Sequence, residues 1–117
     1  MGNENDSILI SIKKLLGITE SYNAFDQDII IHINSVLAIL NQLGVGPKDG
    51  FLLMDDKQVW NDYITGEKLS MVKSYIYLKV RLMFDPPSSG FLIESINRTI
   101  SELEWRLSIT SDNTNIH

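Results

Sequence analysis

The chain has 117 residues, 44% of them hydrophobic and 21% charged, and 15 acidic against 10 basic residues give it a net charge of −5. This length suits one domain, and the apolar fraction is too high for an intrinsically disordered chain. The absence of cysteine excludes a disulfide scaffold, a cysteine zinc site and a thiol nucleophile. The negative net charge argues against a protein whose main task is binding nucleic acid, since such proteins normally carry a basic surface.

The N-terminal region predicts a short helix and no targeting segment. Residues 1–7 contain no basic stretch followed by an apolar one, so a signal peptide is not expected. No apolar run reaches the ~20 residues that cross a bilayer, so no membrane contact is expected. Asp6 or Ser7 can cap a first helix that ends near Leu16, where Gly17 stops it.

A second helix is predicted from Asp26, which can cap it, to the glycines before Pro47. Phe25 has the spacing to pack on Ile30 as a hydrophobic staple. The larger apolar residues recur at helical spacing, which is typical of a helix packed on a core. These residues are Ile29, Ile30, Ile33, Val36, Leu37, Leu40 and Leu43.

A connector and a short third helix follow. The apolar run 51–54 inside the connector 48–54 is too short to assign, and is read as a tucked loop or a short strand. Asp55 and Gln58 then have the spacing of a capping box. The apolar residues of the predicted third helix are Trp60, Tyr63 and Ile64.

Two longer helices complete the prediction. The fourth, over about residues 68–84, is apolar around most of its circumference, which is typical of a central helix. The prolines in 85–87 end it, and Ser88 or Ser89 can cap a fifth helix that runs to about Leu107. The fifth helix has an apolar stripe on one face and an i,i+4 ladder of opposite charges on the other. The stripe is Leu92, Ile96, Ile100, Leu103 and Leu107, and the ladder is Glu94, Arg98, Glu102 and Arg106.

These elements predict an all-α fold, a compact bundle of about five helices with short loops and a flexible C-terminal tail. A single domain is expected over residues 1–117, with an ordered body at about 6–108 and loose tails at 1–5 and 109–117.

The sequence offers no catalytic constellation, cofactor motif or metal site, and the chain is not expected to be an enzyme. His32 lies at the border of the apolar face of the second helix, where Asp28 could pair with it, and His117 is terminal. An HExxH motif, an EF-hand loop and a Glu-x-x-His pair are all absent. A helical nucleotide hydrolase would need clustered carboxylates on facing helices to hold magnesium, and the predicted apolar faces contain none.

Three large apolar residues fall where water is expected. Ile31 and Ile39 lie in the polar sector of the second helix, and Trp105 lies on the charged side of the fifth. Either neighbouring segments cover them or they belong to a contact surface, for which tryptophan is a frequent anchor.

The fourth helix carries an uneven distribution of charge. Lys73, Tyr77 and Arg81 recur every four residues and so line one side of the helix. This side is either a solvated edge or a surface that contacts phosphates or the acids of another copy. Lys79 falls in the apolar sector, so it must snorkel, pair or face another molecule. Residues 68–81 contain four basic side chains and no acid, whereas 49–62 contain four acids and one lysine. Such segregation suits a solvated face or the two halves of a head-to-tail contact between copies.

Beyond these patterns, the chain resembles the head–tail connector, or adaptor, proteins of long-tailed bacteriophages and prophages. The resemblance lies in segments 32–46 and 75–89, in the helix end 102–107, and in Asp62-Tyr63 shortly after Trp60. It extends over residues 7–108 in order and with similar spacing.

The resemblance implies a structural virion protein without enzymatic activity or cofactor. Such subunits form a ring of about a dozen copies beneath the portal protein after DNA packaging. The ring extends the DNA channel and presents a platform for a head-completion or tail component, and DNA passes without sequence-specific binding. Its location is the head–tail junction of the virion, after the host cytoplasm where the subunits are made. The candidate interface residues are Ile31, Ile39, Lys73, Tyr77, Lys79, Arg81 and Trp105. The alternative is a small helical regulatory or nucleic-acid-binding protein that uses the basic face of helix 68–84.

Overall fold

The computed structural model describes residues 4–116 of the chain, and their side chains as far as residue 109. Its helices are α1 (Ile8–Leu15), α2 (Asp26–Gln42), α3 (Trp60–Tyr63), α4 (Leu69–Phe84) and α5 (Gly90–Ile116). The prediction of an all-α fold of about five helices is confirmed. Extended pairing within the described residues is limited to one isolated bridge between Ser7 and Val59.

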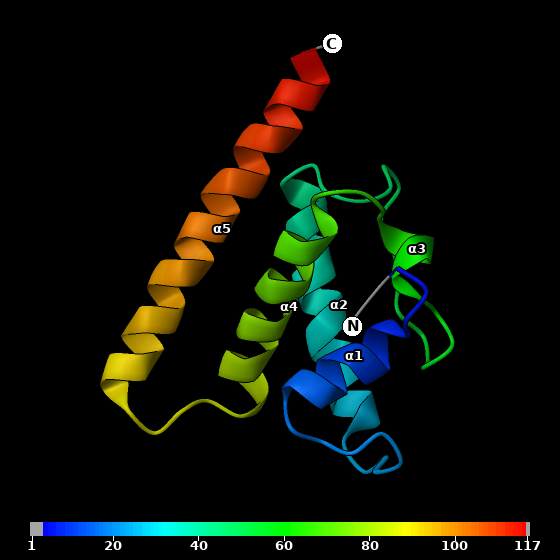
Figure 1. The fold of residues 1–117 in the computed structure, drawn as a ribbon, viewed down its shortest axis with the longest axis vertical. Coiled ribbons are helices and arrows are strands. Elements are labelled where there is room, and N and C mark those ends of the chain that lie inside the picture. Colours follow the sequence, from blue (N-terminus) through cyan, green and yellow to red (C-terminus); the bar gives the residue numbers. More distant parts are fainter. Residues whose placement is uncertain (1–3, 117) are drawn as a thin grey trace.

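Helix α4 is the centre of the molecule. It packs against α1, α2 and α5, and Figure 1 shows it between α5 on one side and the α1–α2 pair on the other. Its inward residues are completely buried, as are those of α2, so the predicted central helix is confirmed. Burying one such aliphatic side chain contributes about 1.5–3 kcal/mol, and this shared face is the main source of stability. The residues with no exposed surface on these two helices are Ile29, Ile33, Val36, Leu40, Val72, Tyr75, Ile76 and Val80.

The start of α2 differs from the prediction. The helix begins at Asp26, Phe25 occupies the capping position, and no side chain caps the first turn. The Asp26 carboxylate instead lies 2.8 Å from Nζ of Lys13, which is 1% exposed and also donates to the Glu20 carbonyl at 3.0 Å. A buried ammonium is costly without a paired charge, so it takes the carboxylate that could otherwise cap the helix. Phe25 packs edge-on against Phe84, with ring centroids 5.2 Å apart.

The end of α2 is set by glycine, as predicted. Gly44 has φ +85°, its N–H donates to Asn41, and the N–H of Val45 donates to Leu40 at 2.9 Å. This is a Schellman motif, in which the left-handed residue lets the last carbonyls of the helix find donors. The chain then turns through Gly46 toward the connector.

The connector is held in place by amide side chains of other segments. Nδ2 of Asn34 donates to the Leu53 carbonyl at 3.0 Å, and the Leu53 N–H donates to Oδ1 of Asn34 at 2.8 Å. Gln58 does the same for the neighbouring residues, since it donates to the Leu52 carbonyl and accepts from the Met54 N–H. The result is an extended segment in which Leu53 is buried and its two neighbours are exposed.

The predicted capping box of Asp55 and Gln58 is wrong, because Gln58 is used by the connector. Helix α3 begins at Trp60, and the Asp62 carboxylate accepts from the Val59 N–H at 2.9 Å instead. Asp55 accepts from the backbone N–H two residues later at 2.9 Å, as in a turn.

The N-terminal segment fastens α3 to α1. The Trp60 N–H donates to the Asp6 carbonyl at 3.1 Å, and the Ile8 N–H donates to the Gln58 carbonyl at 3.0 Å. The Trp60 indole is fully buried and donates from Nε1 to the Ser11 hydroxyl at 3.1 Å. The short α3 is therefore stable because of its tertiary contacts, since an isolated helix of this length is not.

Helix α5 lies along the outer side of α4 (Figure 1). The predicted cap at Ser89 is present, with its hydroxyl accepting from the Leu92 N–H at 3.3 Å. Ile100 and Leu107 are buried, but Leu92, at the start of the predicted stripe, is 49% exposed because the helix begins beyond the end of the core. The backbone stays helical to Ile116, past the predicted end at Leu107. The predicted loose tails, 1–5 and 109–117, stay a prediction, and residues 1–3 and 117 of them lie outside the described residues.

Candidate interaction surfaces

The three apolar residues predicted to face water have different environments. Ile31 is 61% exposed and Trp105 is 65% exposed, so no segment of the described chain covers either one. Ile39 is partly buried and packs against the core. Two of the three are therefore available for contact with a partner, and the third is largely explained by internal packing.

The basic residues of α4 are tied to aromatic rings. Lys73 places Nζ 5.3 Å from the centroid of the Trp60 ring, and Lys79 places Nζ 6.0 Å from that of Tyr75. Arg81 donates from Nη1 to the Tyr77 hydroxyl at 3.2 Å. All three cations are half-buried, so the face is not an open basic stripe.

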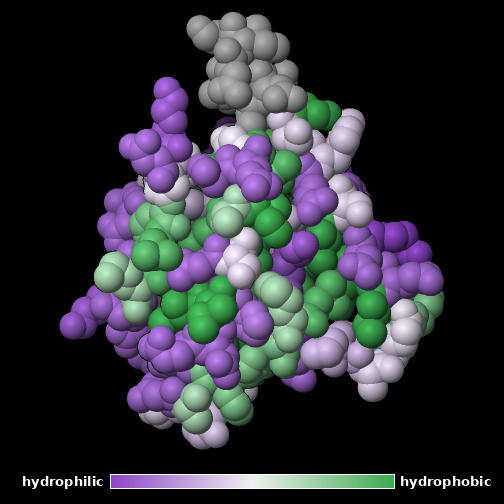
Figure 2. Space-filling model, turned by 180° about the vertical axis from the view of Figure 1, so that it is seen from behind, coloured by the Kyte–Doolittle hydropathy of each residue, from purple (hydrophilic) through white to green (hydrophobic). Residues whose placement is uncertain are grey.

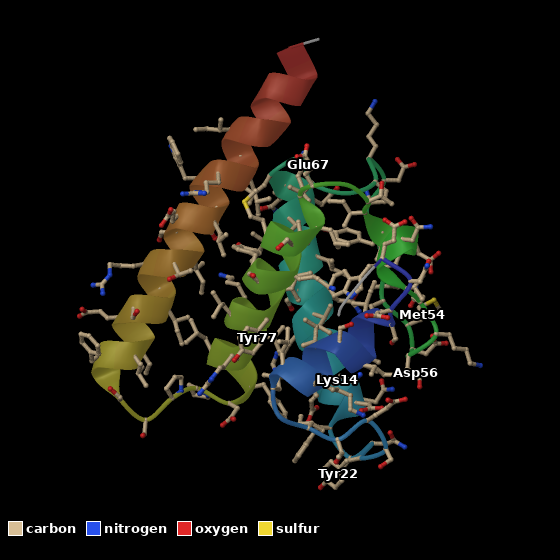
Figure 3. The ribbon with its side chains drawn as sticks, in the orientation of Figure 1. Lys14, Tyr22, Met54, Asp56, Glu67 and Tyr77 are labelled. Carbon is tan, nitrogen blue, oxygen red and sulfur yellow. The ribbon has the colours of Figure 1, made fainter. Side chains whose placement is uncertain are left out.

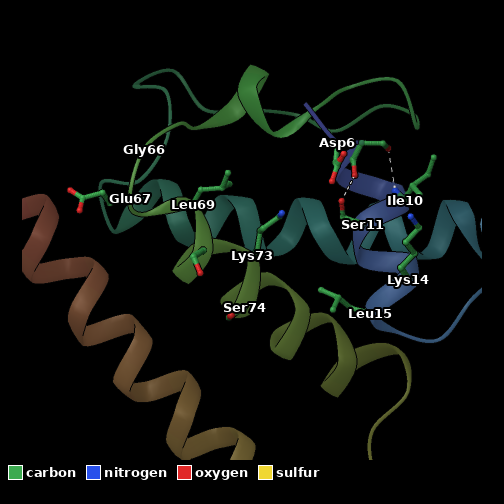
Figure 4. Close-up of a pocket in the computed structure, with 12 residues that line it drawn as sticks. Asp6, Ile10, Ser11, Lys14, Leu15, Gly66, Glu67, Leu69, Lys73 and Ser74 are labelled. Carbon is green, nitrogen blue, oxygen red and sulfur yellow. Dashed lines mark hydrogen bonds between the residues drawn. The ribbon is translucent and has the colours of Figure 1, made fainter. Parts of the chain in front are cut away.

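A groove lies between α1 and the first half of α4 (Figure 4). Its volume is about 860 Å³, and its apolar walls include Ile10, Leu15 and Leu69. Lys14 and Lys73 enter it from opposite walls, so that two ammonium groups stand above an apolar surface. We call this feature the α1–α4 groove.

A second surface is formed by the connector. Leu52 is 62% exposed and Met54 is 68% exposed, and the exposed Asp55 and Asp56 follow directly. We call these four residues the loop surface. Figure 3 places Met54 and Asp56 at the edge of the molecule remote from α5, with Lys14 on α1 nearer the viewer.

The charge segregation of segments 49–62 and 68–81 predicts a solvated face or the halves of a head-to-tail contact, but it does not identify the groove or the exposed apolar residues of the loop. The run 51–54 was assigned no definite structure, because all four residues are apolar and the alternation of exposed and buried side chains is seen only in the structure. The polar residue that fixes it, Asn34, sits beside apolar residues of α2, and a half-buried amide at that position is the signal that could have been followed. Figure 2 shows the far side of the molecule, where hydrophobic groups are broken up by hydrophilic ones.

The next residues to place are the histidines and the acidic side chains that could be reactive or hold a metal ion. His32 is half-buried, with its ring 6.4 Å from that of Phe84, and His117 lies outside the described residues. Among the described side chains, no three of His, Asp or Glu gather closely enough to hold a metal ion. No helix in the described part of the chain combines the length and hydropathy that crossing a membrane requires.

Two buried tyrosines have perturbed ionisation. Burial raises the pKa of Tyr63 and of Tyr75 above the ordinary tyrosine value. The nearby Glu104 raises the pKa of Tyr75 further, because the Tyr75 hydroxyl donates to its carboxylate at 2.7 Å. That bond joins α4 to α5, whereas the Tyr63 hydroxyl has no partner among the described atoms. Both phenols are therefore neutral at pH 7.

Comparison with known proteins identifies the family. The model of the family described as phage connector protein matches residues 8–114, which is nearly the whole chain. The chain belongs to this phage connector family. It is therefore a structural phage protein of the head–tail connector type, as the sequence resemblance implied. Neither the search of curated proteins nor that of solved structures gave a match to the connector.

Proposed function

We propose that this connector is one subunit of a ring that extends the DNA channel of the portal and joins the phage head to the tail after DNA packaging. The observation that carries the proposal is the family match over residues 8–114. Its partners are further copies of itself, the portal protein, and a head-completion or tail component, and its place is the head–tail junction of the virion. The proposed role is geometric and requires no catalytic residue.

Two features of the protein support this proposal. The α1–α4 groove and the loop surface are different parts of the molecule, and a contact between different patches on successive copies produces rings or filaments. The net charge of −5 also suits a DNA channel, because a weakly repulsive wall lets DNA slide.

The alternative, nucleic-acid binding through helix 68–84, receives less support. The Lys73 and Lys79 ammonium groups lie over rings and Arg81 is bonded to Tyr77, so few cations of that helix are free to meet phosphates. Salt-sensitive binding of the protein to duplex DNA, measured by fluorescence anisotropy, would favour this alternative over a connector.

The test of the proposed function is assembly. Native mass spectrometry over a concentration series, with negative-stain imaging of the same samples, should detect a closed ring of about a dozen copies. If the free protein is monomeric, capture by the cognate portal protein is the decisive measurement, because multivalent docking raises the effective concentration of subunits. Failure to assemble in both experiments would overturn the proposal.

The exposed Trp105 provides a variant for the same assay. Trp105→Ala should leave the helical fold intact, because 65% of the side chain is exposed, and should weaken assembly or portal capture if Trp105 is an interface anchor. Arg98→Ala is a matched control on the same helix, since its side chain is also exposed and its ion pair is long, at 3.7 Å. Equal assembly by both variants would remove Trp105 from the interface.

A further inference from the structure

We infer that the loop surface of one copy docks in the α1–α4 groove of the next copy. This inference rests on the proposed function, because it assumes that the subunits meet head to tail. It identifies the two patches that meet, and it adds an apolar component to the contact that the separation of charge along the sequence predicts.

The loop surface is shaped before it binds. Asn34 fixes the backbone of Leu53 with two hydrogen bonds, at 2.8 and 3.0 Å, and Gln58 holds the residues on either side. The buried Leu53 anchors the loop, and the extended backbone then turns Leu52 and Met54 outward. A segment that is already ordered loses little conformational entropy on docking, so its apolar side chains can contribute most of their burial energy to binding.

The groove complements this loop in polarity. Ile10, Leu15 and Leu69 provide an apolar surface for Leu52 or Met54, and Leu15 is 51% exposed in the single copy. Lys14 and Lys73 stand on opposite walls, and Lys73 lies over the Trp60 ring, so Lys14 is the cation that would meet the Asp55 and Asp56 carboxylates that follow Met54. The pairing of opposite charges would fix the direction in which the loop enters.

The groove is also lined by two acidic residues, Asp6 and Glu67. Glu67 is at one end, next to Gly66, and Asp6 lies beside Ser11 on the N-terminal segment (Figure 4). The carbonyl of Asp6 already accepts from the Trp60 N–H, which holds that residue against α3. The groove therefore holds two cations and two carboxylates, and the docking places the loop carboxylates against Lys14.

A copy cannot fill its own groove with its own loop. The loop is bound to α2 through Asn34, whereas the groove lies between α1 and α4. Each copy therefore has one unfilled groove and one free loop, and in a head-to-tail contact the second copy fills the groove of the first and keeps its own groove open. Repeating this contact closes a ring or extends a filament.

Disulfide trapping tests this contact directly, because the chain has no cysteine of its own. One variant carries Met54→Cys on the loop and the other carries Leu15→Cys on the groove wall, and both positions are exposed. Under mild oxidation, a mixture of the two should give mainly a disulfide-linked heterodimer, in excess of either homodimer. Arg98→Cys mixed with Leu15→Cys is the matched control, because Arg98 is also exposed and is not assigned to the contact, and it should give no such excess.

Charge reversal tests the same contact without a covalent bond. Lys14→Glu and Asp56→Lys should each weaken self-association about tenfold, because like charges would then face each other. A chain with both changes, or a mixture of the two single variants, should associate as the natural chain does, because each reversed charge again meets an opposite one. Circular dichroism of the four proteins should be the same, which separates loss of contact from loss of fold.

The outcomes separate this inference from the proposed function. Rings of the natural chain without the heterodimer excess would overturn the docking arrangement and leave the ring intact. The heterodimer excess without a ring, free or on the portal, would support the docking and overturn the proposed function. Absence of both, or failure of the doubly reversed chain to associate, would overturn the docking.

Discussion

The connector loop and the outer face of α5 both present large apolar side chains to solvent, but they are ordered by different interactions. The loop has no regular secondary structure, and side-chain amides of Asn34 and Gln58 fix its backbone. The outer face of α5 belongs to a regular helix, and its two ion pairs, at 2.7 and 3.7 Å, are exposed. The irregular segment is thus fixed mainly by side-chain hydrogen bonds to its backbone, whereas the regular one depends on a buried face and on the Tyr75–Glu104 hydrogen bond.

This difference predicts that substitutions near the loop lower the free energy of unfolding more than substitutions on the outer face of α5. The largest is expected at Gly46, which leads into the connector with φ +92° and whose added Cβ would lie 2.6 Å from a carbon of the Tyr63 ring. Gly46→Ala should lower the free energy of unfolding by about 2–4 kcal/mol, since it adds a steric clash to a strained backbone. Gly50→Ala is the control, because Gly50 has φ +89° and nothing within 4 Å, and should cost about 1–2 kcal/mol. Urea unfolding would measure both, and equal losses would show that the Tyr63 contact is unimportant.

The second largest loss of stability is expected at Asn34, whose side-chain amide fixes the loop. Asn34→Ala removes both hydrogen bonds to Leu53 and should lower the free energy of unfolding by about 2 kcal/mol. Asn34→Asp has nearly the same shape and keeps the acceptor for the Leu53 N–H, but cannot donate to the carbonyl, so its loss should be smaller. Hydrogen exchange at the Leu53 amide should accelerate more in the alanine variant. An unchanged exchange rate in that variant would mean that packing alone holds the loop.

The hydrogen bond between α4 and α5 should give a smaller effect at neutral pH. Tyr75→Phe loses the 2.7 Å bond to Glu104 and should cost about 1–2 kcal/mol. Tyr63→Phe is the matched control, because the Tyr63 hydroxyl has no partner among the described atoms, and it should cost nothing at pH 7.

These tyrosines also predict a dependence on alkaline pH. Their folded pKa values are raised, so the stability linked to them is complete below the unfolded pKa of about 10 and is lost as the pH rises through the folded pKa. Each phenylalanine variant should therefore lose stability less steeply above about pH 10 than the natural chain. Equal slopes for all three proteins in denaturant titrations would contradict the assignment.

The smallest effect is expected on the outer face of α5. Glu102→Gln removes an exposed pair at 2.7 Å and should cost about 0.3–0.5 kcal/mol at low salt, with less effect at high salt. Glu94→Gln is the control at the longer 3.7 Å pair, and should cost less. A cost above about 1 kcal/mol for either variant would show that this face contributes more than exposed ion pairs do.

The sequence was informative where a periodic pattern determined the structure. The apolar periodicity of α2, the nearly all-apolar α4 and the helix-ending glycines after α2 correctly predicted the helices and their boundaries. The cap of α2 was predicted wrongly, because Lys13 is distant in sequence and its burial, which draws Asp26 away, depends on the tertiary fold. The loop at Leu53 was missed for the same reason, since Asn34 lies 19 residues away along the chain.

The candidate surface was predicted only in part. Ile31 and Trp105 could be identified from their helical positions alone, and both are exposed. The cations of α4 could be found, but not their aromatic partners, because the contact of Lys73 with Trp60 depends on how α3 is folded back onto the N-terminal segment. The groove could not be predicted, since its two walls come from helices far apart in the sequence.

The attachment of α5 chiefly to α4 has a consequence for the dynamics of the molecule. Among the described side chains of α5, Ile100 and Leu107 are buried, whereas α1, α2 and α4 together supply most of the buried residues of the same core. Segments with fewer buried contacts open at lower free energy than the global unfolding transition. Helix α5 should therefore detach as a unit while the rest stays folded, and its amides would exchange before those of α2. The α1–α4 groove and the loop surface would then keep their structure while α5 is detached.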